Sequence, residues 1–350
     1  MEGQLYRPTY RDRQTGEPRE AATYWYKYSV KGKRYYEPTG TTDWAEARLF
    51  KFKMLNSIKT AQIKEIKDYW APTNGGTTVQ SLEGLRALYL SYRDPTAPWA
   101  TDPRVRQALI ASLDRQTMVE AIEYGLTKVA DTLPAPDEPV YKVLDQKGFG
   151  RYPYDLKRAE QLLSQAGWTK GPNGKYQNAA GAPFSIEVRT VATTPASLPE
   201  MTAESNAFSN AGFASEIFPI QNGATNAAEL RALSPGTFVN TMENSPEVLA
   251  TFLGTKIATA ANGWRGNLFG YSNPSFDKMY DQYITTLPLT PRLDALSNIL
   301  KMAADEAIFI PLWYSTGSTN IAYRTGIKGP GPIKAWHQAT AWNIQTWEID

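Results

Sequence analysis

Apolar residues recur at spacings of three and four directly after Asp102, in the stretch DPRVRQALIASLDRQTMVEAIEYG. This period predicts a helix with one apolar face. Asp102 suits an N-cap and Pro103 the first helical position, because the missing proline N–H would be unpaired there anyway. Asp114 suits a second N-cap, and Gly125 can end the second helix in the left-handed conformation. The pattern therefore predicts two packed helices at a sharp corner over residues 102–125.

Segments with the periods of strands and of helices alternate along the rest of the chain. Two-residue alternation and short apolar runs predict strands at residues 79–92, 184–188, 213–220, 230–239 and 308–314. Spacings of three and four predict helices at residues 157–166, 202–211, 275–283 and 291–304. The Pro-rich stretch 125–154 is expected to be a loop that is ordered by packing. Such alternation of strands and helices favours a mixed α/β lobe.

A different pattern precedes residue 68. Aromatic and β-branched residues on both sides of the turn KGK indicate a β-hairpin, and Asp43 suits the cap of a helix rich in Ala, Leu and Phe. We expect a small three-stranded antiparallel sheet with one helix over residues 1–67. The next segment, DYWAPTNGGTT (68–78), has the composition of a linker, which leaves residues 79–350 as a second domain.

Charge differs in sign between the two parts. Residues 1–67 carry 14 Lys and Arg against 8 Asp and Glu, a net charge of +6, whereas residues 68–350 carry 23 against 27, a net charge of −4. This asymmetry predicts two unrelated modules.

Residues for catalysis are scarce. The chain has no Cys, a single His at position 337 and no Gly-rich phosphate motif. These facts exclude thiolate metal sites and zinc sites built from several imidazoles, and they leave His337 as the only His for a Ser-His-Asp arrangement. We expect His337 to be structural, and we expect no enzyme activity, no catalytic residue, no metal and no cofactor.

The stretch 102–125 resembles the "D-x-R-V-R-Q-A" signature of the peptide-binding proteins of ABC transporters, the extracellular solute-binding proteins of family 5. Three further stretches are similar to family motifs in the same order: YPYDLKRAEQLLSQAGW (152–168), NGWRGNLFGYSNPSFD (262–277) and IPLWY (310–314). Pro134 and Pro136 fit the Pro-rich loop of the family. The resemblance covers about residues 78–350.

This resemblance implies an α/β chain with an incomplete type II periplasmic-binding-protein-like fold, that is, the second lobe plus return strands. A mixed α/β lobe is expected at about 95–305 and a return to the first lobe at about 306–350. The match begins near the middle of the family's chains, so the resemblance also implies a truncated protein. The implied function is that of the substrate-binding component of an ABC importer for peptides or similar small solutes, with permease subunits as partners.

The resemblance places two loops and one strand beside the ligand cleft. Their aromatic rings and amides suit a peptide, because rings offer contact area and amides pair with a peptide backbone. The predicted ligand-binding residues are Asn240, Glu243, Trp264, Arg265, Asn267, Tyr271, Trp313 and Tyr314. The alternative is a packed surface loop without a ligand.

The string WYKYSVKGKRYYEPTGTTDWAEARLFKFKML resembles the amino-terminal arm-binding domain of phage integrases, the tyrosine recombinases, and implies a chimeric chain. Such domains place Lys and Arg on DNA phosphates. The candidates for DNA contact are Arg11, Arg13, Lys27, Lys31, Lys33 and Arg34. The alternative is a solvated basic hairpin with no partner. Recombinase activity is not expected, since the residues after His337 lack the H-x-x-R pair that strand exchange requires.

Location follows from two opposed observations. Family resemblance implies a periplasmic or otherwise extracytoplasmic protein. The first 20 residues lack the apolar segment of a signal peptide, and no run of 18 apolar residues occurs. The chain as written is therefore expected to be cytoplasmic if it is expressed.

Overall fold

The computed structural model of the protein describes residues 4–11, 17–30, 33–43, 47, 51, 78–80, 84–123, 125, 127–193, 197–243, 245–315, 320–322, 327–328 and 348–349. The chain divides into two compact units, Met1–Gly75 and Gly76–Asp350. Each unit has its own sheet.

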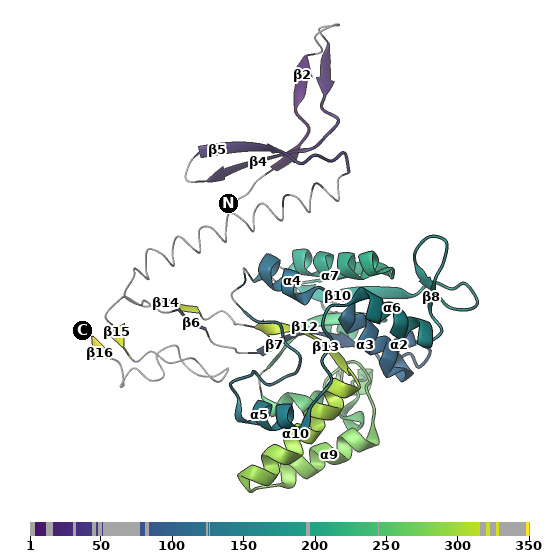
Figure 1. Ribbon diagram of the computed structural model, residues 1–350, viewed down its shortest axis with the longest axis vertical. Coiled ribbons are helices and arrows are strands. Elements are labelled where there is room, and N and C mark those ends of the chain that lie inside the picture. Colours follow the sequence, from purple (N-terminus) through teal and green to yellow (C-terminus); the bar gives the residue numbers. More distant parts are fainter. Residues whose placement is uncertain are drawn as a thin grey trace. The chain divides into compact units, whose positions relative to one another are not determined.

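The first unit contains the three-stranded antiparallel sheet that its sequence predicts. Its strands are β1 (Gln4–Tyr6), β4 (Trp25–Val30) and β5 (Lys33–Pro38), in the order β1-β4-β5. A second pair, β2 (Thr9–Arg11) and β3 (Pro18–Glu20), is also antiparallel (Figure 1). The register pairs Tyr28 with Tyr35 and Lys27 with Tyr36, so successive residues of β4 point to opposite faces.

One face of this small sheet is closed by tyrosines. Tyr26 and Tyr28 are buried, and the ring of Tyr28 stacks between those of Tyr26 and Tyr35, with centroid distances of 5.1 and 5.3 Å. Stacked rings supply apolar area that such a short sheet could not otherwise bury. Ala47 and Lys51 are helical, and the other residues of the helix predicted after Asp43 lie outside the described residues, as does His337. The predicted linker 68–78 also lies outside them, except for Thr78, which belongs to a strand.

The second unit is built on a five-stranded sheet with the order β11-β10-β12-β7-β13. These strands are β7 (Gly84–Leu90), β10 (Ser185–Ala192), β11 (Ala214–Gln221), β12 (Thr237–Glu243) and β13 (Phe309–Ser315). β10 pairs in parallel with β11 and β12, whereas β7 pairs in antiparallel fashion with β12 and β13. Four strands therefore end at the same edge, and β7 begins there.

One face of this sheet is covered by helices from the first half of the unit (Figure 1). They are α2 (Pro98–Thr101), α3 (Pro103–Ala111), α4 (Arg115–Ile122), α6 (Leu156–Gln165) and α7 (Ser197–Ala211). Their apolar faces pack on β7 and β10 residues such as Leu88, Ile186 and Val188. The helix pair predicted at 102–125 is confirmed, since Asp102 and Asp114 accept hydrogen bonds from the backbone N–H groups of Arg104 and Thr117.

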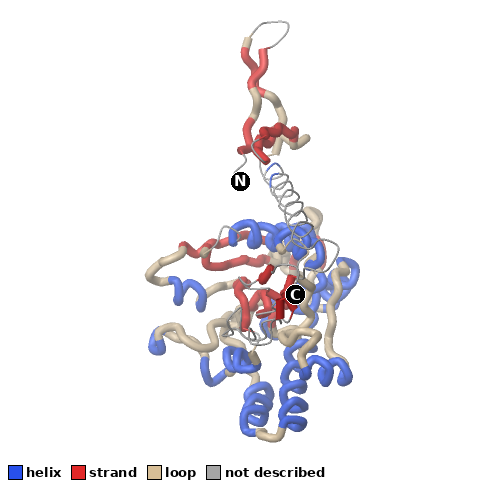
Figure 2. Tube along the Cα trace, turned by 90° about the vertical axis from the view of Figure 1, so that its left-hand side faces the viewer, coloured by secondary structure: helices blue, strands red, loops and turns tan. Residues whose placement is uncertain are grey.

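The opposite face carries three other helices, so that strands lie between two helical layers (Figures 1 and 2). These helices are α5 (Pro139–Lys147), α9 (Pro274–Thr285) and α10 (Leu289–Asp305). Short 3-10 turns support them at Pro246–Phe252, Gly254–Lys256 and Ala260–Asn262. Leu85, Ala87 and Tyr89 of β7 point into this second core, because alternate residues of a strand face opposite sides.

Short two-stranded pieces complete the described part of the unit. β8 (Thr169–Lys170) and β9 (Tyr176–Gln177) form the hairpin predicted from KGPNGKYQNAAGA. β6 (Thr78–Gln80) pairs with β14 (Asn320–Ala322), and β15 (Ile327–Lys328) pairs with β16 (Glu348–Ile349).

Two sequence expectations need correction. The stretch 125–154 was expected to be a loop, but it contains the helix α5, which Pro139 starts at its first position. The strand expected at 230–239 is a helix, α8 (Ala227–Ala232), followed by β12 from Thr237. Pro139 stands at the start of α5, and Pro235 and Gly236 directly precede β12. A Pro or Gly at the boundary of an element does not prevent regular structure next to it.

Candidate functional site

A pocket of about 600 Å³ lies at the edge where the parallel strands end. Its lining includes Thr190 and Thr193 after β10, Asn240 and Thr241 of β12, and Ser315 of β13. Ligands of open α/β sheets bind outside the carboxyl ends of the strands, and a cleft of this volume accepts a small organic solute. The position and size of the pocket make it the candidate functional site.

An arginine and a glutamate in the pocket wall form an ion pair. Arg86 comes from β7 and Glu200 from the first turn of α7, and both side chains line the pocket. Arg86 Nε lies 2.6 Å from Glu200 Oε1 and Nη2 lies 2.5 Å from Oε2, so the pair is bidentate, and Nη1 also donates to Thr241. Burial acts to lower the pKa of Arg86, but the Glu200 carboxylate outweighs it and the net shift is upward. The charge of Arg86 is thus satisfied within the protein.

A second glutamate in the wall has fewer protein partners. Glu123 is the C-cap residue of α4, and its Oε1 accepts a hydrogen bond of 3.1 Å from Trp313 Nε1. Burial raises the pKa of Glu123, with a smaller upward contribution from Glu200, whereas the bond from Trp313 and the charge of Arg86 act to lower it. A carboxylate at the carboxyl end of a helix also meets the negative end of the helix dipole. Burial, Glu200 and the helix end thus favour the neutral form of Glu123, whereas Trp313 and Arg86 favour its charged form.

Behind this wall lies a buried acid. Glu204 is one turn after Glu200 on α7, is fully buried, and neither of its carboxylate oxygens has a hydrogen-bond partner among the described residues. Burial, reinforced by the charge of Glu200, raises the pKa of Glu204 well above its ordinary value, although Arg86 acts in the opposite direction. Burial thus favours the protonated, neutral form of Glu204.

This burial predicts a pH-dependent effect of Glu204→Gln. Because the folded-state pKa is raised, the stabilisation from the protonated acid is complete below the unfolded pKa of about 4.3 and is lost as pH rises toward the folded pKa. We expect the variant to unfold at a higher urea concentration than the parent at pH 8, and we expect this difference to shrink at pH 4. Exposed Glu216 gives the control, Glu216→Gln, with no such trend. A Glu204→Gln protein that is less stable than the parent at pH 8 would contradict the assignment.

Of the eight residues predicted to contact a ligand, Asn240 lines the pocket. Glu243 is exposed at the end of β12. Trp313 and Tyr314 are buried in β13, where Trp313 donates to Glu123 and Tyr314 donates to the carbonyl of Pro134 at 2.9 Å. Trp313 does not line the pocket itself, but its hydrogen bond to Glu123 joins it to a residue that does. Ligand contact by these residues stays a prediction.

The Gly- and Asn-rich loop that follows 3-10 turn 260–262 is held together by its own polar groups. Asn267 is fully buried, donates to the carbonyls of Leu253 and Tyr271 and accepts from the N–H of Gly270. Asn267 and Tyr271, which were both predicted to contact a ligand, are thus buried, and ligand contact by them stays a prediction. One side-chain amide thus pairs with three backbone groups of the loop and its surroundings.

Two other predicted residues of this loop lie nearer the surface. Arg265 is exposed, and Trp264 is half-buried with a left-handed φ of 58° beneath the Arg93 guanidinium, 5.9 Å from its ring centroid. A bulky side chain rarely adopts this backbone region, and such residues concentrate at functional sites. Neither residue lines the pocket described above.

Comparison with known proteins identifies the family. The model of the bacterial extracellular solute-binding proteins, family 5 (middle), matches residues 49–258, more than half of the chain. The chain belongs to family 5 of the bacterial extracellular solute-binding proteins. Among curated relatives of this family 5 chain, the nickel-binding periplasmic protein of Escherichia coli is 24% identical over 236 residues, which are 67% of this chain and 44% of the relative.

Solved structures share the fold of the family 5 chain. The structure of NikZ from Campylobacter jejuni in complex with Ni(L-His) aligns with a TM-score of 0.61 at 20% identity and covers 84% of this chain and 60% of NikZ. The oligopeptide-binding protein of Thermus thermophilus in complex with a pentapeptide aligns with a TM-score of 0.59 at 23% identity, over 71% of this chain and 44% of that protein. The chain thus spans about half the length of the relatives it matches. The periplasmic-binding-protein fold expected from the sequence is confirmed.

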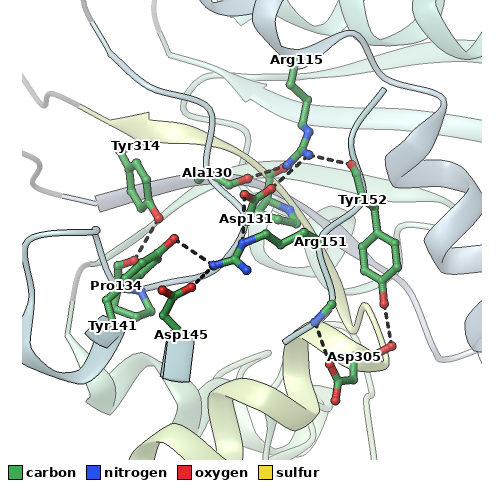
Figure 3. Close-up of polar contacts among 12 residues, drawn as sticks. Arg115, Ala130, Asp131, Pro134, Tyr141, Asp145, Arg151, Tyr152, Asp305 and Tyr314 are labelled. Atoms are coloured by element: carbon green, nitrogen blue, oxygen red, sulfur yellow. Dashed lines mark hydrogen bonds and ion pairs between the residues drawn. The ribbon is translucent and has the colours of Figure 1, made fainter. Parts of the chain in front are cut away.

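Asp114 and Arg115, which lie in the stretch 102–125 that resembles the family 5 proteins, have a structural role (Figure 3). Asp114 caps α4, and Arg115 is a buried cation that donates to the carbonyls of Ala130, Pro311 and Tyr152 at 2.5, 3.0 and 2.8 Å. Its carboxylate partner, Asp131, lies 3.3 Å away. Arg115 therefore joins β13 to two loops that are distant in the sequence.

Neighbouring contacts in Figure 3 extend this network. Arg151 faces the same carboxylate of Asp131 at 3.9 Å and also forms an ion pair with Asp145 on α5. Asp305, at the end of α10, accepts from the N–H of Gly150 at 2.7 Å, and its carbonyl accepts from the Tyr152 hydroxyl at 2.9 Å. These bonds fix the loop before α6 onto α10. The "R-Q" of the signature acts in the same way, since Arg106 and Gln107 donate to the carbonyls of Glu306 and Asp305.

Sequence reasoning missed most of the pocket wall. Arg86 stands alone in the apolar strand GLRALYL, and Glu200 and Glu204 recur at a spacing of four on α7. A charged residue in an apolar strand, and two acids on one helix face, were the available signals. They did not reveal that the strand and the helix meet.

Neither a membrane-spanning helix nor a metal-binding cluster occurs among the described residues. Within the described part of the chain, no helix is long and apolar enough to cross a membrane. Nor do three or more His, Asp or Glu residues come together there in a way that could hold a metal ion.

Proposed function

We propose that the second unit binds a peptide or a similar small solute in the pocket at the strand ends, as part of the substrate-binding component of an ABC importer. The observation that carries this proposal is the place of the pocket, at the carboxyl ends of four parallel strands, in a chain of family 5. The names of the similar proteins, which bind nickel complexes or oligopeptides, support the class of solute. An extracytoplasmic location and an ABC permease partner belong to the same proposal.

The side chains that line the pocket are suited to binding a solute rather than to catalysis. Asn240 and Asn222 are exposed amides, which both donate and accept, and Thr193 adds a hydroxyl. Phe238 and Val191 supply apolar lining for side chains. A peptide needs such partners for its backbone and its side chains, and binding follows from their combination.

Calorimetry with tetra-alanine on the full chain tests this function. We expect saturable binding, and we expect Asn240→Ala to weaken it about two- to tenfold, the size of one lost hydrogen bond. The control is Gln282→Ala, which removes an exposed amide from α9, outside the pocket. Native mass spectrometry of the purified protein provides a second readout. We expect a solute bound to the parent protein and less of it bound to Asn240→Ala. Absence of any bound solute and of any heat with tetra-alanine would refute the proposal.

DNA contact by the first unit is a second candidate. The register places Lys27, Arg34 and Tyr36 on one face of the small sheet, away from the buried Tyr26 and Tyr28, and the Lys27 amine lies 5.8 Å from the Tyr36 ring centroid. Arg11 lies on the exposed strand β2. Of the other DNA candidates, Arg13 and Lys31 lie outside the described residues, and so does the side chain of Lys33.

Fluorescence anisotropy with a 20-base-pair duplex at several salt concentrations tests this candidate. We expect the double variant Lys27→Ala, Arg34→Ala to weaken binding and to reduce the salt slope by about 0.9 for each lost phosphate contact. Binding that is unchanged in the double variant would exclude this face of the sheet.

A further inference from the structure

We propose that Asn222 in the pocket wall is a site of spontaneous deamidation, which converts its neutral side-chain amide into a carboxylate. Asn222 and Gly223 are both exposed, line the pocket and directly follow β11. The modification itself does not depend on the proposed function, whereas its effect on solute binding rests on that function.

The reaction needs an asparagine followed by a residue whose backbone nitrogen can reach the side-chain carbon. Glycine suits this place because it has no side chain to hinder the approach, and Asn is among the chemically least durable residues. Hydroxide removes the proton of the Gly223 nitrogen, which bonds to Asn222 Cγ, and the bond from Cγ to Nδ2 breaks as ammonia leaves with a proton from water. Water then opens the cyclic imide at either carbonyl. The product at position 222 is aspartate or isoaspartate, and the only co-reactant is water.

The turn after β11 leaves the reacting atoms free. The Ala224 N–H donates to the Gln221 carbonyl at 3.1 Å, which closes a turn with Asn222 and Gly223 at its centre. Gly223 has a left-handed φ of 81°, which glycine adopts without strain. Within the part of the chain that the structure describes, neither the Asn222 amide nor the Gly223 N–H has a hydrogen-bond partner. The amide can therefore rotate, and the nitrogen can approach its carbon.

The Asn-Gly pair between β8 and β9 has the same sequence but is held by hydrogen bonds. Asn173 is also exposed, and its Oδ1 accepts from the Lys175 N–H at 3.0 Å. The Gly174 N–H donates to the Gly171 carbonyl at 2.9 Å. Both the amide and the nitrogen must give up a partner before they can react.

A further exposed pair, Asn262 with Gly263, is held more firmly. The Asn262 amide accepts from the N–H groups of Thr259 and Arg265 and donates to the carbonyl of Ile257. The Gly263 N–H also donates to a carbonyl. Hydrogen bonding rather than exposure thus distinguishes Asn222 from the described pairs that share its sequence.

Deamidation of Asn222 changes the charge of the pocket. The lining contains two basic side chains, Arg86 and Arg231, and two acidic ones, Glu123 and Glu200. A carboxylate at position 222 adds a third acid and removes the two N–H donors of the amide. The modified pocket is more negative and has fewer donors for the carbonyl groups of a peptide.

Peptide mapping by mass spectrometry of the folded full chain, kept at pH 9 and at pH 6, tests the proposal. Trypsin cleaves after Lys and Arg and so releases the three pairs in separate peptides, and deamidation adds about 1 Da to a peptide. At pH 9 we expect conversion at Asn222 to be about tenfold or more faster than at Asn173, and slowest at Asn262, because hydrogen bonds must first break at the other two positions. Conversion at pH 6 is expected to be slower, since hydroxide is scarcer. Equal rates at the three positions at pH 9, or a lower rate at Asn222, overturn the proposal.

Two controls assign the difference to the fold and to this residue. In urea at the same pH the hydrogen bonds are lost, and the three rates are expected to converge. A ranking that persists in urea shows that sequence alone sets it and overturns the structural argument. Asn222→Gln keeps an amide but would need a larger ring to react, so its tryptic peptide is expected to stay unmodified. Conversion that continues in this variant comes from another Asn of the peptide and also overturns the proposal.

Calorimetry with tetra-alanine on fresh and on aged protein measures the effect on the pocket. We expect the aged parent to bind about two- to tenfold more weakly, the size of one lost hydrogen bond, and Asn222→Gln to keep its own affinity through the same incubation. Unchanged binding after Asn222 has converted excludes an effect on the pocket. Absence of heat with the fresh protein refutes the proposed function and leaves the modification standing.

Discussion

Replacing Arg115 by Met is expected to lower the free energy of unfolding of the second unit by about 3–5 kcal/mol, the loss found when one partner of a buried ion pair is removed. Arg115 is 4% exposed, and its guanidinium serves the carbonyls of Ala130, Pro311 and Tyr152 as well as Asp131. Met fills much of the volume but donates no hydrogen bond, so buried acceptors lose their partner.

Urea unfolding monitored by Trp fluorescence measures this loss. The matched control is Arg104→Met on the neighbouring helix, where the side chain is 47% exposed and pairs only with Asp102. Exposed pairs contribute about 0–1 kcal/mol, so the control is expected to unfold close to the parent. Equal midpoints for Arg115→Met and Arg104→Met would show that the network of Figure 3 contributes little.

The second large effect is expected at Phe252, at the end of its 3-10 turn. Its ring is 2% exposed and lies within 6.3 Å, centroid to centroid, of the rings of Tyr89, Tyr271, Phe276 and Phe309. Phe252→Ala removes the centre of this cluster and is expected to cost about 3–5 kcal/mol, because a cavity adds to the lost burial. The same change should increase hydrogen exchange near Leu253, Phe269 and Tyr271, which belong to the same core.

Phe218→Ala provides the comparison for Phe252. Phe218 is 40% exposed on β11, at the edge of the sheet, where Arg189 stacks on its ring at 4.3 Å. Its removal leaves no enclosed cavity, and we expect a loss of about 1 kcal/mol or less. A loss at Phe252 as small as that at Phe218 would mean that the second core repacks around the gap.

The sequence predicted those features of the fold that depend on neighbours in the chain. Asp102, Asp114 and Asp155 each cap the helix that was expected to follow them, because an N-cap bond spans only two or three residues. The strands at β10, β11 and β13 were predicted for the same reason, from runs of apolar residues that need no partner to be recognised.

The pocket could not be predicted in this way, because its wall depends on contacts between distant segments. Arg86 and Glu200 come from β7 and α7, and Glu123 meets Trp313 across the sheet. In the loop around Asn267, by contrast, the composition suggested a ligand site. The Asn267 side-chain amide instead forms hydrogen bonds with the backbone of Leu253, Gly270 and Tyr271. Composition does not reveal whether a polar group is satisfied by its own fold.

The position of β7 in the sheet has a consequence for the order of folding. β7 is the first strand of the five to be synthesised, yet Tyr89 pairs with Phe238 on one side and with Phe309 on the other. One edge of this almost wholly apolar strand stays open until residues 237–243 have left the ribosome, and the other edge stays open until residues 309–315 have done so. Such long-range pairings slow folding and leave nascent chains prone to aggregate. The second unit should therefore depend on a chaperone that shields β7 until translation is nearly complete.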